Sequence, residues 1–545
     1  MKGLMQEQQL NIPMVLRHAE QLHGRKTVTT KVDDGVSTRT FAETGRRARQ
    51  LMTALQDLGV KEDDRVATFC WNNQQHLETY VAAPCIGAIL HTLNIRLFDA
   101  DLGYIVNHAQ DSVVVVDKSL WPQWQKVAAR VDSVRQVICV NDTPGPAPEG
   151  TIDYEELIAS HPPLADLPDI PEDHAAAMCY TSGTTGHPKG VLYSHRSNVL
   201  HSFMAAMVDS IGLSETDTVL PIVPMFHANA WGLPYASLLT GANLVMPARF
   251  MTPEPLTSLL IDQKVTLAFG VPTIWLGLAD SLKQSRDKLS LRSIICGGSA
   301  VPPSLQKRYQ DDVGVRIVHA WGMTETSPLA SICRPLAVHQ DLSASDLDQV
   351  LTSQGRILPG VELRLADDEG KELPWDGSTV GEIQVRGNWI ADSYYNDDSS
   401  SEKFVAGWLR TGDVATVDSD GYIRIVDRTK DLVKSGGEWI SSVELEGLIM
   451  AHPDVAEAAV IAVAHPKWDE RPLACVVVRQ GATLTREDIL DHLEGQVARW
   501  WLPDDVVFIE EVPKTSVGKF DKKVLRERFK DHAMPEVPAS AASVS

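Results

Sequence analysis

Along the first half of the chain, segments with apolar residues at helical spacing alternate with short apolar runs that are typical of strands. Residues 40–59 begin with a capping-box pattern and continue with apolar positions at helical spacing, which predicts a helix. An apolar strand at 66–70 and another helix at about 73–87 are expected next. The run 113–116 consists of valines only, as is typical of a strand that is buried on both faces. Strands that alternate with helices of this length predict βαβ units and parallel sheets.

The second half of the chain has a different pattern. Alternating residues and turn signals at 361–374 and 382–387 predict a β-rich subdomain. A polar stretch at 427–431 separates it from a region with the pattern of a small α+β domain. The elements expected in that region are helices near 442–451 and 486–499 and strands at 455–464 and 473–478. The expected fold class is α/β, with a large N-terminal domain of parallel or mixed sheets, flanking helices, a β-rich subdomain and a small α+β C-terminal domain.

Composition and charge narrow the classes of function. The chain has 545 residues, and its 50 Lys and Arg against 72 Asp and Glu give a net charge of −22. A strongly acidic protein lacks the basic surface that nucleic acids or anionic lipids require. With 43% hydrophobic and 22% charged residues, the composition is that of a globular protein rather than a disordered one.

The cysteines and the lengths of the apolar runs indicate the cellular compartment of the protein and whether it spans a membrane. The seven cysteines include no CxxC pair, and most of them lie in apolar strand-like runs, which favours buried, reduced thiols. The N-terminus has no sustained apolar segment of a secretory signal, and nowhere do about 18 apolar residues run uninterrupted. A cytoplasmic protein without a transmembrane segment is expected.

The stretch 180–195, YTSGTTGHPKGVLYSH, has the composition of a phosphate-binding loop. Glycines let the backbone direct its N–H groups at an anion, hydroxyls add donors, and a lysine adds a point charge. The spacing is not that of a Walker A loop. A surface linker is the alternative, but apolar strands on both sides argue against it. The hydroxyl residues are Thr181, Ser182, Thr184 and Thr185, the glycines are Gly183, Gly186 and Gly190, and the lysine is Lys189.

With its flanks, this loop resembles the phosphate signature of the AMP-forming adenylating enzymes: acyl-CoA synthetases, luciferases and the adenylation domains of peptide synthetases. Further signatures of that superfamily follow in its order and extend the resemblance over about residues 40–525. They are GGSA from 297, HAWGMTETSP from 319, QGRILPGVE from 354, GWLRTGDVA from 407, GYIRIVDRTKDLVKSGGEWISSVELE from 421 and PKTSVGKFDKK from 513. The likeness is closest to medium- and long-chain fatty acyl-CoA synthetases.

The resemblance implies a nucleotide site. Glu325 and Thr181 stand where the superfamily binds Mg²⁺, which prefers oxygen ligands. Trp321 replaces the usual Tyr or Phe on which adenine stacks, and Asp413 stands where a carboxylate accepts the ribose hydroxyls. Lys519 matches the lysine that bridges the carboxylate and the α-phosphate, where a fixed cation reduces anion repulsion. The other residues assigned to ATP or AMP are Ser182, Gly183, Thr184, Thr185, Lys189, Gly298, His319, Gly322, Thr324, Arg428, Lys430, Lys434 and Trp439. A tight turn at Gly298 and a structural Asp–Arg pair at Arg428 are the alternatives.

The resemblance also implies a domain that changes position between two half-reactions. The expected domains are an N-terminal adenylating domain at 1–426, a hinge at 427–432, a mobile C-terminal lid domain at 433–533 and a flexible tail at 534–545. Lys430 falls at the hinge. Acyl and CoA binding is assigned to His227, Trp231, Gly298, Gly436, Gly437 and Glu438, with a pantetheine tunnel along the two adjacent glycines and an aromatic gate at Trp231.

The expected function is an ATP-dependent, AMP-forming acid–CoA ligase that activates a medium- or long-chain fatty acid through an acyl-adenylate, with Mg²⁺ and as a homodimer. A ligase for a short or thioether acid, such as methylmercaptopropionate, stays open. So does a free-standing adenylation enzyme that loads a carrier protein. A different class of function is a non-catalytic regulator that binds a nucleotide or an acyl group. Lys519 argues against it, because a protein that only binds its ligand does not need a lysine that bridges the carboxylate and the α-phosphate. An α/β-hydrolase is disfavoured because no GxSxG elbow occurs.

Overall fold

The computed structural model describes residues 1, 3–181, 187–398, 400–435, 438–515, 520–532 and 534, and only the backbone of Glu438. Several residues predicted to bind ligands lie outside this part of the chain, as does the tail beyond Met534. They are Ser182, Gly183, Thr184, Thr185, Gly436, Gly437 and Lys519. Within the described residues, the helices are too short or too polar to cross a membrane.

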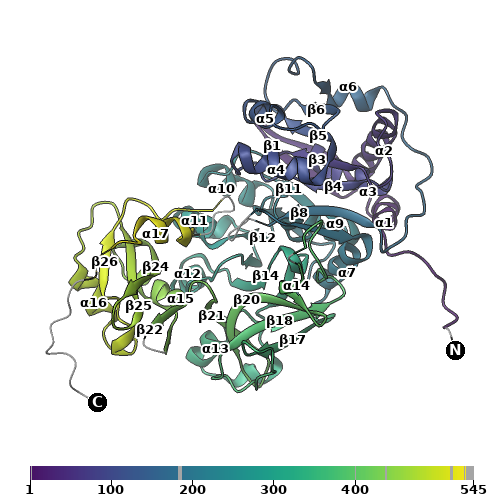
Figure 1. The fold of residues 1–545 in the computed structure, drawn as a ribbon. Helices are drawn as coiled ribbons and strands as arrows, with labels where there is room; N and C mark the ends of the chain where they lie inside the picture. The colour runs from purple at the N-terminus through teal and green to yellow at the C-terminus, as the bar shows by residue number, and fades with distance from the viewer. Residues whose placement is uncertain are drawn as a thin grey trace.

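Two large sheets form the main part of the protein (Figure 1). In spatial order, the first contains β7 (Ile152–Asp153), β6 (Gln136–Val140), β5 (Asp111–Asp117), β3 (Arg65–Phe69), β4 (Ile89–Thr92), β8 (Ala175–Tyr180) and β9 (Gly190–Ser194). The second contains β16 (Arg356–Ile357), β15 (Leu329–Ile332), β14 (Ile317–Gly322), β13 (Ser293–Cys296), β12 (Leu267–Gly270), β10 (Thr218–Pro221), β11 (Asn243–Met246), β1 (Thr27–Val32) and β2 (Gly35–Thr40). Their central pairs are parallel, whereas β8–β9, β1–β2, β14–β15 and β15–β16 are antiparallel, so both sheets are mixed.

Helices cover these sheets and also lie between them. The inner layer includes α3, which contacts β4 and β8 of one sheet and β1 of the other, and α7 and α9, which contact each other. The helices before the C-terminal domain are α1 (Ile12–Leu22), α2 (Phe41–Asp57), α3 (Gln74–Cys85), α4 (Asp99–Ala109), α5 (Trp121–Ala128), α6 (Tyr154–Ala159), α7 (His195–Ala206), α8 (Ala228–Trp231), α9 (Leu233–Thr240), α10 (Pro253–Asp262), α11 (Pro272–Gln284), α12 (Pro303–Arg308), α13 (Ala344–Leu351) and α14 (Ser400–Lys403). Short 3₁₀ and π turns are η1 (Lys118–Leu120), η2 (Arg286–Lys288), η3 (Tyr309–Val313), η4 (Thr324–Thr326), η5 (Ala337–Asp341) and η6 (Arg499–Trp501).

Two smaller sheets complete the fold and correspond to the β-rich subdomain and the α+β domain expected from the sequence. The subdomain sheet consists of β17 (Val361–Ala366), β18 (Gly381–Gly387), β19 (Phe404–Val405), β20 (Trp408–Val417) and β21 (Ile423–Arg428). The C-terminal domain consists of β22 (Val433–Ser435), β23 (Glu438–Ile440), β24 (Val455–His465), β25 (Asp469–Val478) and β26 (Asp505–Phe508), with α15 (Ser442–Met450), α16 (Arg486–Leu493) and α17 (Lys522–Arg528). Figure 1 shows this domain, in yellow-green, projecting beside α11 and α12.

Most sequence predictions of local structure are confirmed. Thr40 and Glu43 form the capping box of α2, every residue of β5 is buried, and all seven cysteines are buried and unpaired. The helix expected at 486–499 is wrong at its C-terminal end, because α16 ends at Leu493. Glu494 is already extended, and Gly495 adopts a left-handed conformation that turns the chain away from the helix. The α/β fold class is confirmed.

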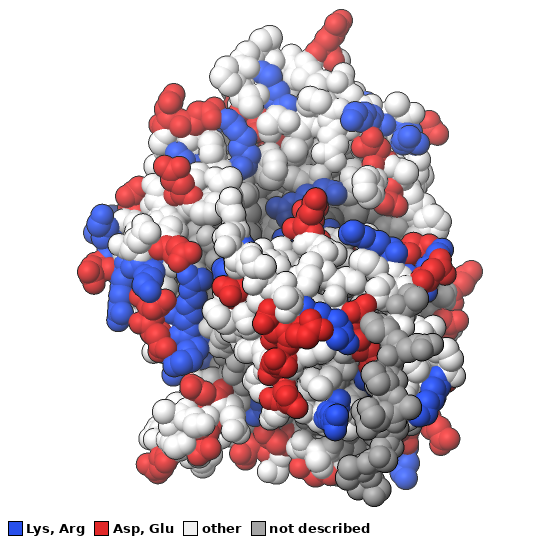
Figure 2. Space-filling view, turned by 90° about the vertical axis from the view of Figure 1, so that its left-hand side faces the viewer, with Lys and Arg blue, Asp and Glu red and all other residues white. Residues whose placement is uncertain are grey.

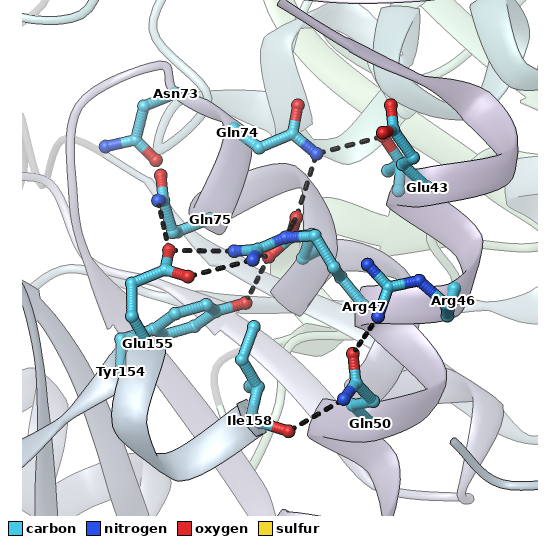
Figure 3. Close-up of polar contacts among 12 residues, drawn as sticks. Glu43, Arg46, Arg47, Gln50, Asn73, Gln74, Gln75, Tyr154, Glu155 and Ile158 are labelled. Atoms are coloured by element: carbon cyan, nitrogen blue, oxygen red, sulfur yellow. Dashed lines mark hydrogen bonds and ion pairs between the residues drawn. The ribbon is translucent and has the colours of Figure 1, made fainter. Parts of the chain in front are cut away.

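A buried ionic network joins three helices at one end of the first sheet (Figure 3). The Arg47 guanidinium on α2 lies 2.5 Å from the fully buried Glu78 carboxylate on α3 and 2.8 Å from Glu155 at the start of α6. The Tyr154 hydroxyl donates to Glu78 at 2.7 Å, and the Gln74 amide donates to the same carboxylate at 2.9 Å. A buried charge is tolerated when it is paired and hydrogen-bonded in this way.

The Arg47→Met variant is expected to lose about 3 kcal/mol of unfolding free energy, because the buried Glu78 carboxyl group is then left without its cationic partner. Chemical denaturation followed by circular dichroism measures the change. Arg46→Met is the matched control, since Arg46 is exposed and bonds only Gln50 among the described residues; its effect is expected to stay within about 0.5 kcal/mol. Equal effects of the two substitutions would contradict a stabilising role for the network.

Candidate active site

A cavity of about 340 Å³ opens at the carboxyl ends of the parallel strands β13 and β14. Open α/β sheets bind ligands at this edge, because the loops that leave parallel strands meet there. Segments between residues 181 and 430 contribute to its wall. The lining residues are Thr181, His187, Lys189, His227, Ala228, Trp231, Gly297, Gly298, Ala320, Trp321, Gly322, Met323, Thr324, Glu325, Pro328, Leu329, Tyr394, Lys403, Thr411, Gly412, Arg428, Thr429 and Lys430.

The candidate phosphate loop connects the antiparallel strands β8 and β9. Backbone hydrogen bonds close its base: the Thr181 N–H donates to the Lys189 carbonyl at 2.9 Å. In return, the Lys189 N–H donates to the Thr181 hydroxyl at 3.1 Å. The hairpin therefore holds the first hydroxyl and the lysine of the motif side by side on the wall of the cavity.

Glu325 lies in η4, the turn that follows β14, and its side chain faces the cavity although the residue is only 5% exposed. Its Oε1 atom accepts a hydrogen bond from the Tyr394 hydroxyl at 2.6 Å. The turn requires Gly322, because a Cβ there would lie 1.8 Å from the Pro328 carbonyl oxygen. The Tyr193 hydroxyl donates to the Thr324 carbonyl at 2.7 Å and holds the same turn.

Asp413 lies behind the cavity wall and holds two of the lining residues. Its Oδ2 atom accepts from the Trp321 indole N–H at 2.8 Å, and its Oδ1 atom lies 3.0 Å from Arg428 Nε. The pairing of β20 with β21 brings Asp413 opposite Arg428. The nearby Asp413 carboxylate raises the pKa of Arg428. The structural ion pair considered for Arg428 is therefore present, and the partly exposed guanidinium still lines the cavity.

The part of the cavity wall that contains Ala228 and Trp231 is built on a left-handed turn. Residues 228–231 all have φ between +42° and +58°, a conformation that is strained for L-residues and occurs mainly where function requires it. The turn directs Trp231 toward the GGSA segment, where a Cβ on Gly297 would lie 3.6 Å from Trp231 Cη2 and 2.4 Å from the Ala320 carbonyl oxygen. Glycine is therefore required at position 297, a site residue that the sequence analysis missed.

Cations dominate the polar part of the cavity. Of the lining side chains that the structure describes, Glu325 is the one carboxylate, whereas four are lysines or arginines. Those four are Lys189, Lys403, Arg428 and Lys430. Burial lowers the pKa of Lys430, as expected for an ammonium group removed from water. In a protein of net charge −22, this local excess of cations suits a polyphosphate. The face drawn in Figure 2, by contrast, shows acidic and basic side chains interspersed.

The donor set fits a magnesium ion that arrives with a nucleotide. Groups of three or more His, Cys, Asp or Glu that could bind a metal do not occur in the described parts of the chain. Mg²⁺ commonly uses one or two protein oxygens and takes the rest from phosphates and water. Thr181 and Glu325 line the same cavity and supply two such oxygens.

Four described residues that were predicted to bind ligands do not line the cavity: Asp413, whose contacts are given above, and His319, Lys434 and Trp439. His319 is buried in β14, and burial lowers its pKa to about 4, so the ring is neutral. Lys434 and Trp439 face each other across the β22–β23 hairpin, with the ammonium 4.9 Å from the indole ring. The remaining described residues assigned to ATP or to the acid, apart from Asp413 and the side chain of Glu438, line the cavity together.

The expected hinge segment is bonded to both domains. The Asp427 carboxylate accepts the Ser442 N–H of α15 at 2.7 Å, and Asp431 pairs with Arg526 of α17 at 2.5 Å. Between these residues, the Thr429 N–H donates to the Gly412 carbonyl of the N-terminal domain at 3.0 Å. The hinge and the domain boundaries stay predictions.

Comparison with known proteins decides the family. The sequence profile of the AMP-binding enzymes matches residues 16–395, and that of the AMP-binding enzyme C-terminal domain matches residues 444–519. The chain belongs to the AMP-binding enzyme family. A 3-methylmercaptopropionyl-CoA ligase of Ruegeria lacuscaerulensis is 45% identical over 97% of this chain and 99% of its own. A medium-chain fatty-acid–CoA ligase of Ectopseudomonas oleovorans is 44% identical over 97% and 98%, and a long-chain fatty-acid–CoA ligase of Thermus thermophilus is 45% identical over 97% of each chain.

Solved structures of the family have the same fold. An anthranilate CoA ligase in complex with anthranoyl-AMP matches with a TM-score of 0.85 and 25% identity, over 95% of this chain and 97% of its own. ATP-bound MatB of Rhodopseudomonas palustris matches with a TM-score of 0.82 and 27% identity, over 96% and 99%. The resemblance found in the sequence, to AMP-forming acyl-CoA synthetases and their superfamily, is confirmed by these comparisons.

Sequence reasoning missed several lining residues besides Gly297. Tyr394 and Lys403 lie outside every signature, so nothing in the local sequence marks them. His187 lies inside the phosphate motif but was passed over; its ring stacks on Tyr104 of α4, with 4.4 Å between the ring centroids. The available sequence signal for His187 was the presence of a histidine within the phosphate motif.

Proposed function

We propose that the protein is an ATP-dependent, AMP-forming acid–CoA ligase that activates a medium- or long-chain fatty acid. The observation that carries the proposal is the mixed lining of one cavity. Cationic side chains and the Glu325 carboxylate share its wall with apolar groups such as Ala228, Trp231 and Leu329. A site of this kind suits a nucleotide triphosphate beside an apolar acid. The named fatty-acid–CoA ligases, 44–45% identical, support the same choice.

In the first step, a carboxylate oxygen of the acid attacks the α-phosphorus of ATP. The bond from that phosphorus to the bridging oxygen breaks, and pyrophosphate leaves with the electron pair. Lys189, Arg428 and Lys403 line the wall where negative charge gathers, and fixed cations in a cavity reduce the repulsion between the two anions. Thr181 and Glu325 would hold Mg²⁺, which supplies neutralisation of phosphate charge when bound.

In the second step, the CoA sulfur attacks the acyl carbon, AMP leaves with the bonding electrons and the thiol proton is released. Lys519 and the pantetheine segment at 436–438 act in different half-reactions in this scheme. The hinge at 427–432 therefore has to let the C-terminal domain present first one and then the other. Bonds from both domains to that segment are consistent with a joint that transmits such a rotation.

The length of the acid is set by the apolar part of the cavity. Each methylene buried there contributes about 0.8 kcal/mol, so kcat/KM is expected to rise about fourfold per methylene until the chain reaches the end of the site. Trp231 would act as an aromatic gate to this part of the cavity, as the resemblance implies. Relatives with thioether and with fatty acids in their names have nearly equal identity, so both acid classes belong in the test.

The test is a panel of acids from C3 to C18, with aromatic acids and 3-methylmercaptopropionate, in which pyrophosphate and AMP release are measured with ATP and CoA. Highest kcat/KM for a C8–C18 fatty acid is the expected result. A maximum at 3-methylmercaptopropionate would contradict the substrate class but not the reaction. Turnover with a carrier protein and none with CoA would indicate a free-standing adenylation enzyme. Failure of all acids to release pyrophosphate would leave a binding protein and overturn the proposal.

The same proposal includes Mg²⁺ as the metal of the ATP complex, a homodimer and a cytoplasmic location. The resemblance to fatty acyl-CoA synthetases, which often form dimers, supports the assembly. The seven buried, reduced thiols support a reducing compartment. Size-exclusion chromatography with light scattering measures the mass, and a monomer at micromolar concentration would contradict the dimer.

A further inference from the structure

The segment 388–398, between β18 and α14, runs along the cavity and belongs to none of the superfamily signatures found in the sequence. Two backbone hydrogen bonds attach it to elements of the site. The Ala391 N–H donates to the Glu325 carbonyl at 2.8 Å, and the Tyr395 N–H donates to the Gly190 carbonyl at the start of β9, also at 2.8 Å. The segment thus joins the turn that carries Glu325 to the hairpin that carries Lys189.

Between these two attachments, the side chain of Tyr394 touches both charged groups. Its hydroxyl donates to Glu325 Oε1 at 2.6 Å, and the Lys189 ammonium lies 4.9 Å from the centre of its ring. Tyr394 is only 6% exposed, and its ring packs edge-on against Phe404 with 5.2 Å between the centroids. The ring is therefore fixed where it meets the carboxylate and the cation.

Electrostatics suit a neutral donor at this position. A phenol carries one O–H donor, and the acceptor-only carboxylate of Glu325 receives it at 2.6 Å. One oxygen of Glu325 is oriented by this hydrogen bond, while the carboxylate keeps lone pairs for a metal. Outer hydrogen-bond partners of this kind orient metal ligands and commonly change metal affinity when removed.

A second residue of the same segment contacts the lysine. Asp397 Oδ2 lies 3.2 Å from Lys189 Nζ, with both side chains partly exposed. Lys189 is thus held by an aromatic ring and a carboxylate from one segment. Attraction between an ammonium and a ring face adds about 0.5–2 kcal/mol, depending on exposure, which is enough to restrict a lysine side chain.

We propose that Tyr394 is a positioning residue for the magnesium complex of ATP: its hydroxyl orients Glu325 and its ring places Lys189. The role rests on the function proposed above. The hydroxyl of Tyr394 orients the proposed metal ligand Glu325, and the ring positions the proposed phosphate-binding residue Lys189. Different substitutions of Tyr394 can therefore remove the hydroxyl alone or the hydroxyl together with the ring.

The first test is Tyr394→Phe, with ATP affinity measured by isothermal titration calorimetry in Mg²⁺ and in EDTA. The variant keeps the ring under Lys189 and loses only the hydroxyl. Its affinity for metal-free ATP is expected to stay within about twofold of wild type. The concentration of Mg²⁺ that half-restores tight ATP binding is expected to rise about 10–100-fold.

The second test is Tyr394→Leu, which removes the ring as well. Because Lys189 then loses its aromatic contact, affinity for metal-free ATP is expected to fall about 2- to 30-fold, in addition to the loss of magnesium response. The difference between the Phe and Leu variants in EDTA thus reports the ring alone. Tyr395→Phe is the matched control, since the neighbouring hydroxyl has no contact with Glu325 or Lys189 among the described residues, and it is expected to bind like wild type.

The outcomes are distinguishable. If Tyr394→Phe needs the same Mg²⁺ concentration as the wild-type protein to half-restore tight ATP binding, the proposal is overturned. Equal loss of affinity in Mg²⁺ and in EDTA, with a lowered melting temperature, would show a structural role only and would also overturn it. Absence of any magnesium effect on ATP binding by the wild-type protein would instead contradict the proposed function on which the role rests.

Discussion

Replacing Lys519 with alanine is expected to slow acyl-adenylate formation about 10²–10³-fold, because a fixed cation between two repelling anions is lost from the transition state. Thioester formation from supplied acyl-adenylate and CoA is expected to remain near the wild-type rate. The two half-reactions are measured separately, by exchange of labelled pyrophosphate into ATP and by release of AMP from the adenylate. The match to the family's C-terminal domain extends to residue 519 and places the lysine in it.

Lys523→Ala is the control for this experiment. Lys523 belongs to the same basic cluster and is exposed in α17, so its loss is expected to leave both half-reactions unchanged. Lys522 is unsuitable, because its ammonium is buried 2.7 Å from Glu446 and its removal would disturb packing. An equal fall of both half-reactions in Lys519→Ala would show that the lysine does not act specifically in adenylation.

Replacing Asp413 with asparagine is expected to raise the Kd for ATP about 10²–10³-fold. Both carboxylate oxygens accept from cavity residues, Oδ2 from Trp321 and Oδ1 from Arg428. An amide presents N–H to one of these donors, so one of them loses its acceptor and the wall beside the nucleotide shifts. One charge-assisted hydrogen bond, at about 1.5–3 kcal/mol, is lost and the other becomes a neutral bond of about 0.5–1.5 kcal/mol, and these two losses together set the size of the effect.

Calorimetric titration with ATP measures this change, and quenching of Trp321 fluorescence reports whether the indole has moved. Asp420→Asn is the matched control, since that exposed carboxylate of the same subdomain lies away from the cavity, 3.8 Å from His339. Unchanged ATP affinity in Asp413→Asn would refute the assignment of this carboxylate to the nucleotide site.

Much of the local structure could be predicted because it depends on neighbours in the sequence. The capping box at Thr40 and the buried strand β5 follow from residues a few positions apart, and the structure contains both. The end of α16 was missed, although Gly495 offered a signal, because the hydrophobic spacing continues past the residue where the backbone turns.

The site could be predicted in part. The superfamily motifs contain Thr181, Glu325 and Arg428, which line one cavity in the structure, and His319, which does not. Position within a motif does not determine which side of a strand a residue faces. In β14, Ala320, Trp321 and Gly322 line the cavity, whereas His319 is buried elsewhere.

The sequence by itself determined the family, the order of strands and helices, and the chemistry of the phosphate loop, because these depend on residue types at short spacings. The tertiary structure alone decided that Tyr394 meets Glu325 and Lys189, which are separated from it by 69 and 205 positions. Such contacts arise where sheets pack and loops from distant strands converge, and no local pattern records them. The mixture of cationic and apolar groups in the cavity wall has the same origin, because the cavity is assembled from segments between residues 181 and 430.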